Sequence, residues 1–461
     1  MPQFVSGYAY FRKAVLVQAL LLSGALTSTA QLTFSDASAA PVIIDPQATT
    51  GLSNVYVLPA TRGVTAVAAV DGSASAAKVY KFSNLGAAYA QEIECSPVSG
   101  GVGFALEDGD MGYMVESASG RSKYYWVTDY SRHTYDVTDA VADATLSDCD
   151  MLAIKLSGSA SAIYYYTING RRSELGRGIE VEYNTLAFDE NVYEYRETQV
   201  SETIDHAGED GVIRVRQPLC RTDIEVTGDR FLKAWGEQHT VVLNDVAPGG
   251  VEANTKAEVT ERDSPNEKKE EGSDALGGSA PCEITFTAAV TDAAAFHQWQ
   301  IARDEEFNIV DLQYNELDFT YVFREQGYSY VRFVASDEND VCQYYGDVYT
   351  VYIGDSRLEC PNIFSPGASE GVNDEWRVSY KSIVSFQCDI FNRWGVKVAS
   401  LSDPSQGWDG RYKGKLVPAG VYFYVIKAQG ADDKAYNLSG DINVINYKGS
   451  ESPSTGPSET P

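Results

Sequence analysis

The chain has 461 residues, which is enough for three or four domains of ordinary size, and 44% of its residues are hydrophobic. Its 36 Lys and Arg stand against 65 Asp and Glu, so the formal net charge is −29. This acidic balance argues against nucleic-acid binding and against a polybasic membrane contact, because both need a basic protein surface. A composition of 30 Tyr and 39 Gly with only 4 Met favours β-structure, and 4 His leave little room for histidine-based catalysis.

Residues 1–30 have the order of a secretory signal peptide. Arg12 and Lys13 precede an apolar run over 14–22, and small residues follow at 27–30. The apolar run is too short to span a bilayer as a stable helix, so an N-terminal anchor is the less favoured interpretation. No Cys stands near the cleavage point, which argues against a lipoprotein. We therefore expect an exported protein whose mature chain begins at Gln31.

Short runs of alternating apolar and polar residues make up most of the mature chain, and helical periodicity is nearly absent. Examples are 79–82, 111–116, 124–127, 151–156, 162–168, 178–183 and 212–215. Asn169-Gly170 is a hairpin turn signal. The regular spacing of strands and turns predicts an all-β fold of tandem Ig-like β-sandwich modules, the first two at 42–131 and 132–260.

The middle of the chain contains a charged, turn-rich stretch at 261–279, which we interpret as a flexible linker. After it, Cys282, Trp299 and Cys342 follow one another with strand patterns between them. This Cys…Trp…Cys order predicts an Ig-like or PKD-like sandwich over 280–355. The chain ends in small and polar residues, and we expect a disordered tail over 448–461.

Seven cysteines remain in the mature chain, and none forms a CxxC pair, which argues against zinc ribbons and thioredoxin-like redox motifs. In an exported protein, disulfides are the default. The pairings suggested by spacing are Cys282–Cys342, Cys149–Cys220 and Cys360–Cys388. Two alternatives stay open: Cys95 pairs with Cys149 and leaves Cys220 free, or several of the cysteines are reduced and buried.

Catalytic motifs are missing from the sequence: it has no HExxH, no GxSxG and no P-loop. The four histidines, His133, His206, His239 and His297, are widely scattered. Acidic loops at 107–110 and 369–374 offer oxygen ligands for Ca²⁺, but neither has EF-hand spacing. A pair of glycosidase carboxylates would not be visible in sequence. We predict a protein that is not an enzyme and that has no cofactor and no metal centre.

Five motifs follow one another in the last part of the chain, over 358–447. They are CPNIFSP at 360–366, VNDEW at 372–376, IFNRWG at 390–395, GWDG at 407–410 and PAGVYFYVI at 418–426. This order closely resembles the gliding-motility-associated C-terminal domain, the type B sorting domain of type IX secretion cargo in Bacteroidota. The residues that carry the resemblance are Pro361, Asn362, Phe364, Pro366, Asn373, Asp374, Asn392, Arg393, Trp394, Gly395, Trp408, Asp409, Gly410, Gly420 and Tyr422.

The motif residues also make sense as folding determinants. Val384, Phe386, Cys388 and Ile390 alternate and predict one buried face of a strand. The 392–394 segment is expected at a strand end, with Arg393 against an aromatic face or paired with an acid. Two features depart from the family pattern. The usual Asn-x-Asp-Gly loop is replaced at 367–371, and the chain continues beyond the domain into the polar tail.

The resemblance implies a small β-sandwich sorting domain that is recognised as a whole, preceded by a PKD-like domain. It implies passage of the inner membrane by the Sec route and of the outer membrane through the type IX translocon. The implied partner at the surface is a PorP/SprF-like outer-membrane barrel, and other cell-envelope proteins are further candidate partners. We therefore expect a protein associated with the outer membrane at the cell surface, acting as a structural or accessory component of a surface, secretion or motility complex.

The alternative function is that of a small surface adhesin or glycan-binding protein. Aromatic clusters at 124–126 and 164–166 would stack on sugars if they were exposed. Alternating Tyr residues that cover a sheet face explain the same pattern without a ligand.

Overall fold

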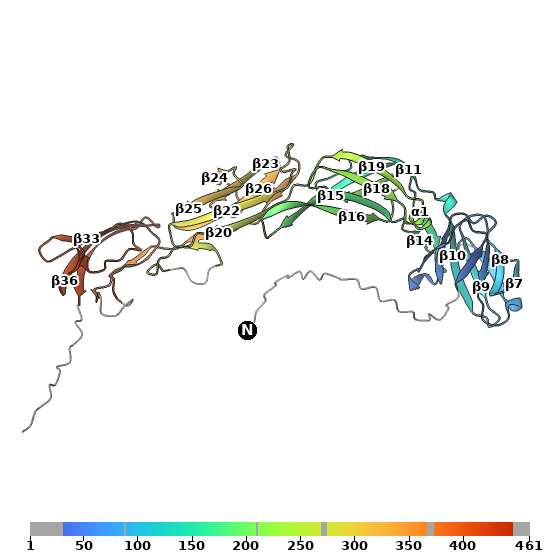
Figure 1. Cartoon of the computed structure of the whole chain (residues 1–461), viewed down its shortest axis with the longest axis horizontal. Coiled ribbons are helices and arrows are strands. Elements are labelled where there is room, and N and C mark those ends of the chain that lie inside the picture. The colour runs from blue at the N-terminus through green and yellow to red at the C-terminus, as the bar shows by residue number, and fades with distance from the viewer. Residues whose placement is uncertain (1–30, 87–88, 209–210, 269–273, 367–372, 446–461) are drawn as a thin grey trace, which may run out of the picture. The chain divides into compact units, whose positions relative to one another are not determined.

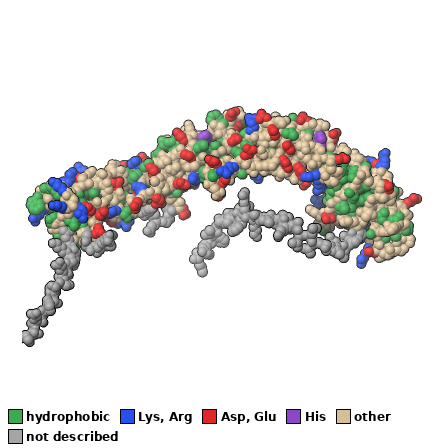
Figure 2. All heavy atoms as spheres, in the orientation of Figure 1, with side chains coloured by type: hydrophobic (Ala, Val, Ile, Leu, Met, Phe, Trp, Pro, Cys, Tyr) green, Lys and Arg blue, Asp and Glu red, His purple; other side chains and the backbone are tan. Residues whose placement is uncertain are grey.

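The computed structural model describes residues 31–86, 89–208, 211–268, 274–366 and 373–445, and strands are their main secondary structure (Figure 1). The predicted signal peptide and the predicted tail lie outside the described residues. Within the described ranges, no helix is long and apolar enough to cross a membrane. Asp and Glu side chains are spread over the face shown in Figure 2, in keeping with the net charge of −29. The chain divides into two compact units, which are described separately.

The first unit is built on two sheets. One has the order β1 (Leu32–Ser35), β4 (Thr65–Ala68), β8 (Gly101–Ala105), β7 (Cys95–Val98). The other has the order β2 (Val42–Ile44), β3 (Asn54–Leu58), β10 (Ser122–Asp129), β9 (Met111–Glu116), β5 (Lys78–Phe82), β6 (Gln91–Ile93). Tyr56, Tyr113 and Tyr125 are fully buried in one apolar core. The Tyr56 and Tyr113 hydroxyls each accept a backbone N–H at 2.8 Å, so they are buried without an unpaired oxygen.

Two segments from the middle of the chain also belong to the first unit, and they do not fold with the predicted 132–260 module. One is the hairpin β13 (Ile163–Tyr166) and β14 (Arg172–Leu175), joined by the predicted turn, in which Gly170 has φ +76°. The other is the short helix α1 (Arg230–Trp235), whose aromatic side chains pack against Tyr130. Alternating apolar residues reveal the hairpin strands but not the sheet on which they pack, so the predicted boundaries differ from those in the structure.

The second unit begins with a seven-stranded sandwich. One sheet has the order β11 (Asp136–Ala142), β12 (Met151–Ser159), β17 (Val212–Arg216). The other has the order β16 (Glu194–Ile204), β15 (Ile179–Asp189), β18 (Thr222–Gly228), β19 (His239–Val246). Val181, Val215 and Ile224 are fully buried and alternate with exposed or half-buried neighbours. This is the pattern expected of sheets with one solvated face.

A second sandwich of this unit contains Trp299 at its centre. One sheet is β20 (Ala253–Val259), β22 (Cys282–Val290), β25 (Asp318–Phe323). The other is β21 (Leu276–Gly278), β28 (Tyr349–Ile353), β26 (Gly327–Ser336), β23 (Phe296–Ala302), β24 (Val310–Tyr314), with β27 (Gln343–Tyr345) also paired to β26. The Trp299 ring contacts Phe286, Phe319 and Phe333, and its Nε1 donates to the Leu317 carbonyl at 3.0 Å.

The C-terminal part of the unit is a third small sandwich. Its main sheet is β30 (Ile363–Phe364), β37 (Ala435–Val444), β36 (Gly420–Gly430), β32 (Ile383–Phe391), β33 (Lys397–Leu401). Two short pairs complete it, β29 (Arg357–Glu359) with β31 (Ser379–Lys381) and β34 (Arg411–Tyr412) with β35 (Lys415–Leu416).

The alternation predicted for strand β32 is confirmed at three of its four positions. Phe386, Cys388 and Ile390 are buried. A bulge after Ile383 shifts the register, so Ile383 takes the next core position and Val384 packs against the core that surrounds Trp299.

The predicted linker at 261–279 is wrong as a flexible segment over its described part. The Asn266 amide donates to the carbonyls of Val378 and Pro404, both at 2.7 Å, and the backbone of Glu267 forms a parallel β-bridge with that of Tyr380. Further on, β21 pairs in parallel with β28. The charged composition suggests a flexible segment because it does not reveal these contacts, which are made by backbone groups and by one side-chain amide. The charged side chain of Glu267 is itself held by an ion pair with Arg262.

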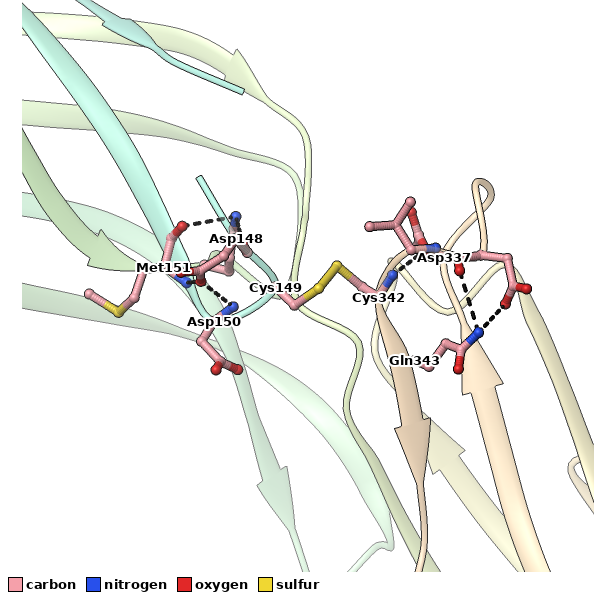
Figure 3. The surroundings of a disulfide bond; sticks show 10 residues. Asp148, Cys149, Asp150, Met151, Asp337, Cys342 and Gln343 are labelled. Carbon is pink, nitrogen blue, oxygen red and sulfur yellow. Dashed lines mark hydrogen bonds between the residues drawn. A yellow bond between two sulfur atoms is a disulfide. The ribbon is translucent and has the colours of Figure 1, made fainter. Parts of the chain in front are cut away.

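One disulfide is formed among the described cysteines, and it joins Cys149 to Cys342 across 193 residues (Figure 3). Each cysteine lies in a loop that an aspartate holds in a tight turn. Asp148 Oδ1 accepts the N–H groups of Asp150 and Met151 at 2.9 and 2.8 Å. Asp337 Oδ1 accepts the N–H groups of Val341 and Cys342 at 2.7 and 2.8 Å. The bond therefore links the loop before β12 to the loop before β27.

The pairings expected from spacing are wrong. Cys282 is buried at the start of β22, opposite Phe323, which ends β25 just before β26 begins at Gly327. Cys342 lies beyond the other end of β26. The ten residues of β26 separate the two by roughly 30 Å, far beyond the reach of a disulfide. Cys220 is a buried free thiol, and Cys360 and Cys388 are both free within the C-terminal sandwich. Cys95 is also free, so the Cys95–Cys149 alternative is wrong as a pairing, although it left Cys220 free as the structure does.

Candidate functional site

Most of the aromatic motif residues in the C-terminal sandwich form its core. Phe364, Trp376, Trp408 and Tyr422 are all buried. The Trp408 ring lies 5.3 Å from those of both Phe364 and Tyr422, and Trp376 and Trp408 exchange backbone hydrogen bonds of 2.9 Å. The Trp376 indole N–H donates to the carbonyl of Pro361 at 2.6 Å. Motifs far apart in the sequence therefore meet in one cluster.

The Gly407–Gly410 motif is a turn that this cluster requires. Gly410 has φ +70°, and a Cβ placed on it would lie 2.7 Å from Pro366 Cγ. Asp409 Oδ1 accepts the N–H of Arg411 at 2.9 Å, and Trp408 Nε1 donates to the carbonyl of Arg411 at 3.1 Å. Glycine is therefore needed both for the turn and for the close packing of Pro366.

The remaining motif residues lie at the surface or close to it. Asn362 and Asn373 act through their backbone carbonyls, which accept N–H groups from Asn443 and Ser365. Gly420 begins β36 with φ +150°. The residues of the set that are exposed are Pro361, Asn362, Asn373, Arg393, Trp394, Gly395, Asp409 and Gly420, and Asp374 and Asn392 are half-buried.

The Asn392–Gly395 motif is the turn between β32 and β33, as predicted for a strand end. The Asn392 Oδ1 accepts the N–H groups of Trp394 and Val396, both at 3.0 Å, which fixes the turn. The Arg393 guanidinium lies 4.3 Å from the centre of the Trp394 ring, so the expected aromatic contact is confirmed. Trp394 is 72% exposed and contributes nothing to the core.

An apolar stripe runs along the outer face of β36, the central strand of the main sheet. Val421, Phe423 and Val425 are each 45% exposed. Ile363, in the same cross-strand row as Val421, is 50% exposed, and Phe423 is opposite Phe391, which directly precedes the Asn392–Gly395 turn. The sequence motifs do not mark this stripe as a surface feature. Its signal was present in the run VYFYVI at 421–426, which is apolar on both faces of one strand.

Charge distinguishes this sandwich from the rest of the chain. Residues 358–443 contain nine Lys and Arg and ten Asp and Glu, so almost the whole net charge of −29 lies elsewhere. Arg411, Lys413 and Lys415 are exposed on the β34–β35 hairpin, which lies against β33. Figure 2 shows Lys and Arg side chains gathered beside hydrophobic ones over this module.

Burial keeps the two thiols of the sandwich, Cys360 and Cys388, in the protonated form, which is a poor nucleophile. Burial raises the pKa of the Cys388 thiol to about 12, and the neighbouring Cys360 adds to the shift. The pKa of Cys360 is also raised by burial. Within the described ranges, no group of three or more His, Cys, Asp or Glu residues is arranged to hold a metal ion.

These features define a small β-sandwich with an exposed apolar stripe along β36 and exposed cations on the β34–β35 hairpin. Residues 358–443 match the CHU_C type IX secretion signal domain, and residues 141–243 match the fibronectin type III domain. The chain therefore carries a type IX secretion signal behind a fibronectin type III or Ig-like domain, which confirms the resemblance seen in the motifs. This signal indicates export out of the cell.

Comparison with whole proteins adds little to the domain matches. No curated protein matches the chain. A solved tetra-tandem repeat from the extending region of a large adhesion protein is 11% identical, with 82% of this chain and 95% of that one covered and a TM-score of 0.19. Dimeric latent PorU from Porphyromonas gingivalis is 12% identical, with 70% and 35% covered and a TM-score of 0.15. Likenesses at this level carry no argument about the fold or the function.

Proposed function

We propose that this protein is a non-enzymatic component of the cell surface that is held there by its C-terminal sandwich. After export through the type IX translocon, the sandwich docks on an outer-membrane barrel of the PorP/SprF kind. The upstream sandwiches then serve as a structural or accessory part of a surface, secretion or motility complex.

The observation that carries the proposal is the exposed stripe on β36. A central strand with a solvated outer face ordinarily carries polar residues there. Here Val421, Phe423 and Val425 are apolar on the outer face, while Tyr422 and Ile426 fill the core on the other. Contiguous exposed apolar residues on a soluble domain mark an interaction surface, because leaving them in water is unfavourable.

The Asn392–Gly395 turn supports the same interpretation. Trp394 and Arg393 form an exposed aromatic–cation pair, and Trp and Arg are the residue types most enriched at interface hot spots. Two hydrogen bonds to Asn392 already hold the turn, so docking costs little further conformational freedom of this loop.

Recovery of the partner from outer membranes tests the proposal. The mature protein and its Phe423→Ser variant are bound to resin and incubated with detergent-solubilised outer membranes of the native host. Val242→Ser is the matched control, since Val242 is 43% exposed on β19 of another sandwich. We expect a stoichiometric barrel protein with the wild type and the control and its loss with Phe423→Ser. Equal recovery with all three proteins contradicts docking through β36.

A further inference from the structure

A second surface feature lies on the sandwich that contains Trp299 and is independent of the proposed docking face. A hollow of about 540 Å³ is formed over the outer face of its larger sheet. Among the side chains that line it, six long ones come from three neighbouring strands. They are Phe296, Gln298 and Gln300 of β23, Arg332 of β26, and Gln343 and Tyr345 of β27.

Strand register places these six side chains on one face. Arg332 is opposite Gln300, Val334 is opposite both Gln298 and Tyr345, and Ser336 is opposite both Phe296 and Gln343. Because side chains alternate between the two faces of a sheet, partners in these rows point the same way. These six side chains of the hollow are therefore positioned by paired strands.

Arg332 is the central charge of the hollow. Its guanidinium lies 4.1 Å from the ring centre of Phe307 and 5.2 Å from that of Tyr345, and its Nε donates to Gln300 Oε1 at 2.9 Å. Gln300 is only 8% exposed, so the bond is anchored in a buried side chain. Among the described residues, no carboxylate forms an ion pair with Arg332, and none accepts a hydrogen bond from its two terminal amino groups. A guanidinium that is held in place and has both terminal amino groups available suits a carboxylate, which it binds bidentately.

The rest of the lining is suited to a polyhydroxylated molecule. Phe296 is 60% exposed and Tyr345 is 59% exposed, so both aromatic side chains are open to contact by a ligand. The Tyr345 hydroxyl donates to Gln343 Oε1 at 2.8 Å, and Gln343 Nε2 donates to Asp340 Oδ1 at 3.0 Å. These bonds orient the ring and the amide in advance. Aromatic rings pack against the C–H groups of a sugar ring, while the glutamine amides and the Asp340 carboxylate hydrogen-bond to its hydroxyls.

We propose that this hollow binds an acidic sugar unit of a glycan, with the sugar carboxylate on Arg332 and the ring against Tyr345 and Phe296. The charge of the chain makes the choice specific. The chain has a net charge of −29, so most of its surface repels an anion, whereas Arg332, which has no ion-pair partner among the described residues, attracts one.

Calorimetric titration of the mature protein tests the assignment. Sialyllactose and trigalacturonic acid are the acidic probes, and lactose is the neutral one. We expect a Kd of about 0.1–1 mM for at least one acidic probe, at least about tenfold weaker binding of lactose, and weaker acidic binding at high salt. Arg332→Gln should reduce the affinity for the acidic probe at least about tenfold, as for the loss of a charged hydrogen bond.

Two further variants locate the binding. Tyr345→Ala should also weaken it at least about tenfold. Tyr328→Ala is the matched control, because Tyr328 is a 52% exposed tyrosine on the outer face of β26 that does not line the hollow. Circular dichroism checks that each variant is folded. Four results overturn the proposal: no binding of either acidic probe at about 10 mM, equal binding of lactose, unchanged affinity in the Arg332 and Tyr345 variants, or equal loss with Tyr328→Ala.

Discussion

Two tryptophans of the C-terminal sandwich should respond in opposite ways to replacement by alanine. Trp376 is fully buried, and its indole N–H donates to the Pro361 carbonyl at 2.6 Å. Trp394 is 72% exposed and touches only Arg393 among the ring and cation contacts of the described residues. Both stand in motifs of the secretion signal domain, and the motifs do not say which of the two is buried.

The structure sets the size of each effect. Trp376→Ala leaves a large cavity and an unpaired carbonyl, so we expect a loss of about 3–5 kcal/mol in the free energy of unfolding of the sandwich. Trp394→Ala removes an exposed cation–π contact, so we expect a loss of no more than about 1 kcal/mol.

Hydrogen exchange followed by mass spectrometry measures both effects in the intact mature chain. Since about 1.4 kcal/mol corresponds to a factor of ten, amides of β36 and β37 should exchange at least about a hundredfold faster in the Trp376 variant. In the Trp394 variant they should change by no more than about fivefold. Similar acceleration in both variants, or a larger effect at Trp394, would refute the separation of core from surface motif residues.

Other predictions address the remaining contacts. Peptide mapping without reduction should find Cys149 joined to Cys342, and replacing both by serine should cost up to about 5 kcal/mol in the chain-entropy model; a different pairing contradicts the structure. Because the folded pKa of Cys388 is raised to about 12, its contribution to stability is complete below the unfolded pKa of 9.0 and falls as pH rises from there towards 12. Alkylation of Cys388 at mildly alkaline pH should therefore be slow in the native protein and fast in urea, and fast native labelling contradicts its burial. Asn266→Ala should cost about 1–3 kcal/mol, because it leaves the carbonyls of Val378 and Pro404 without that donor. It should speed exchange at β31, and no change there contradicts a structural role for the segment before β21.

The all-β fold could be predicted from sequence because strand alternation is a local property. The Asn169-Gly170 turn, the burial of Phe386, Cys388 and Ile390, and the position of the Asn392–Gly395 turn are all confirmed on that basis. The type IX secretion signal could also be recognised, because its motifs are short and ordered.

Features that depend on distant contacts could not be predicted in this way. The Cys149–Cys342 bond joins loops 193 residues apart, and nothing in the spacing of either cysteine indicates its partner. The predicted linker holds its neighbours through the amide of Asn266 and through backbone groups, which composition does not reveal. Trp376 and Trp394 show the same limit for the site, because a motif identifies both residues without saying which one faces water.

We propose above all that the C-terminal sandwich directs the protein to the cell surface. The most direct measurement compares the surface-exposed fraction of the intact chain with that of a chain ending after Ile353, by protease treatment of whole cells and fractionation. We expect the intact chain to be digested at the surface, while the shortened chain collects in the periplasm and is protected. A shortened chain that reaches the surface at the level of the intact chain would contradict it.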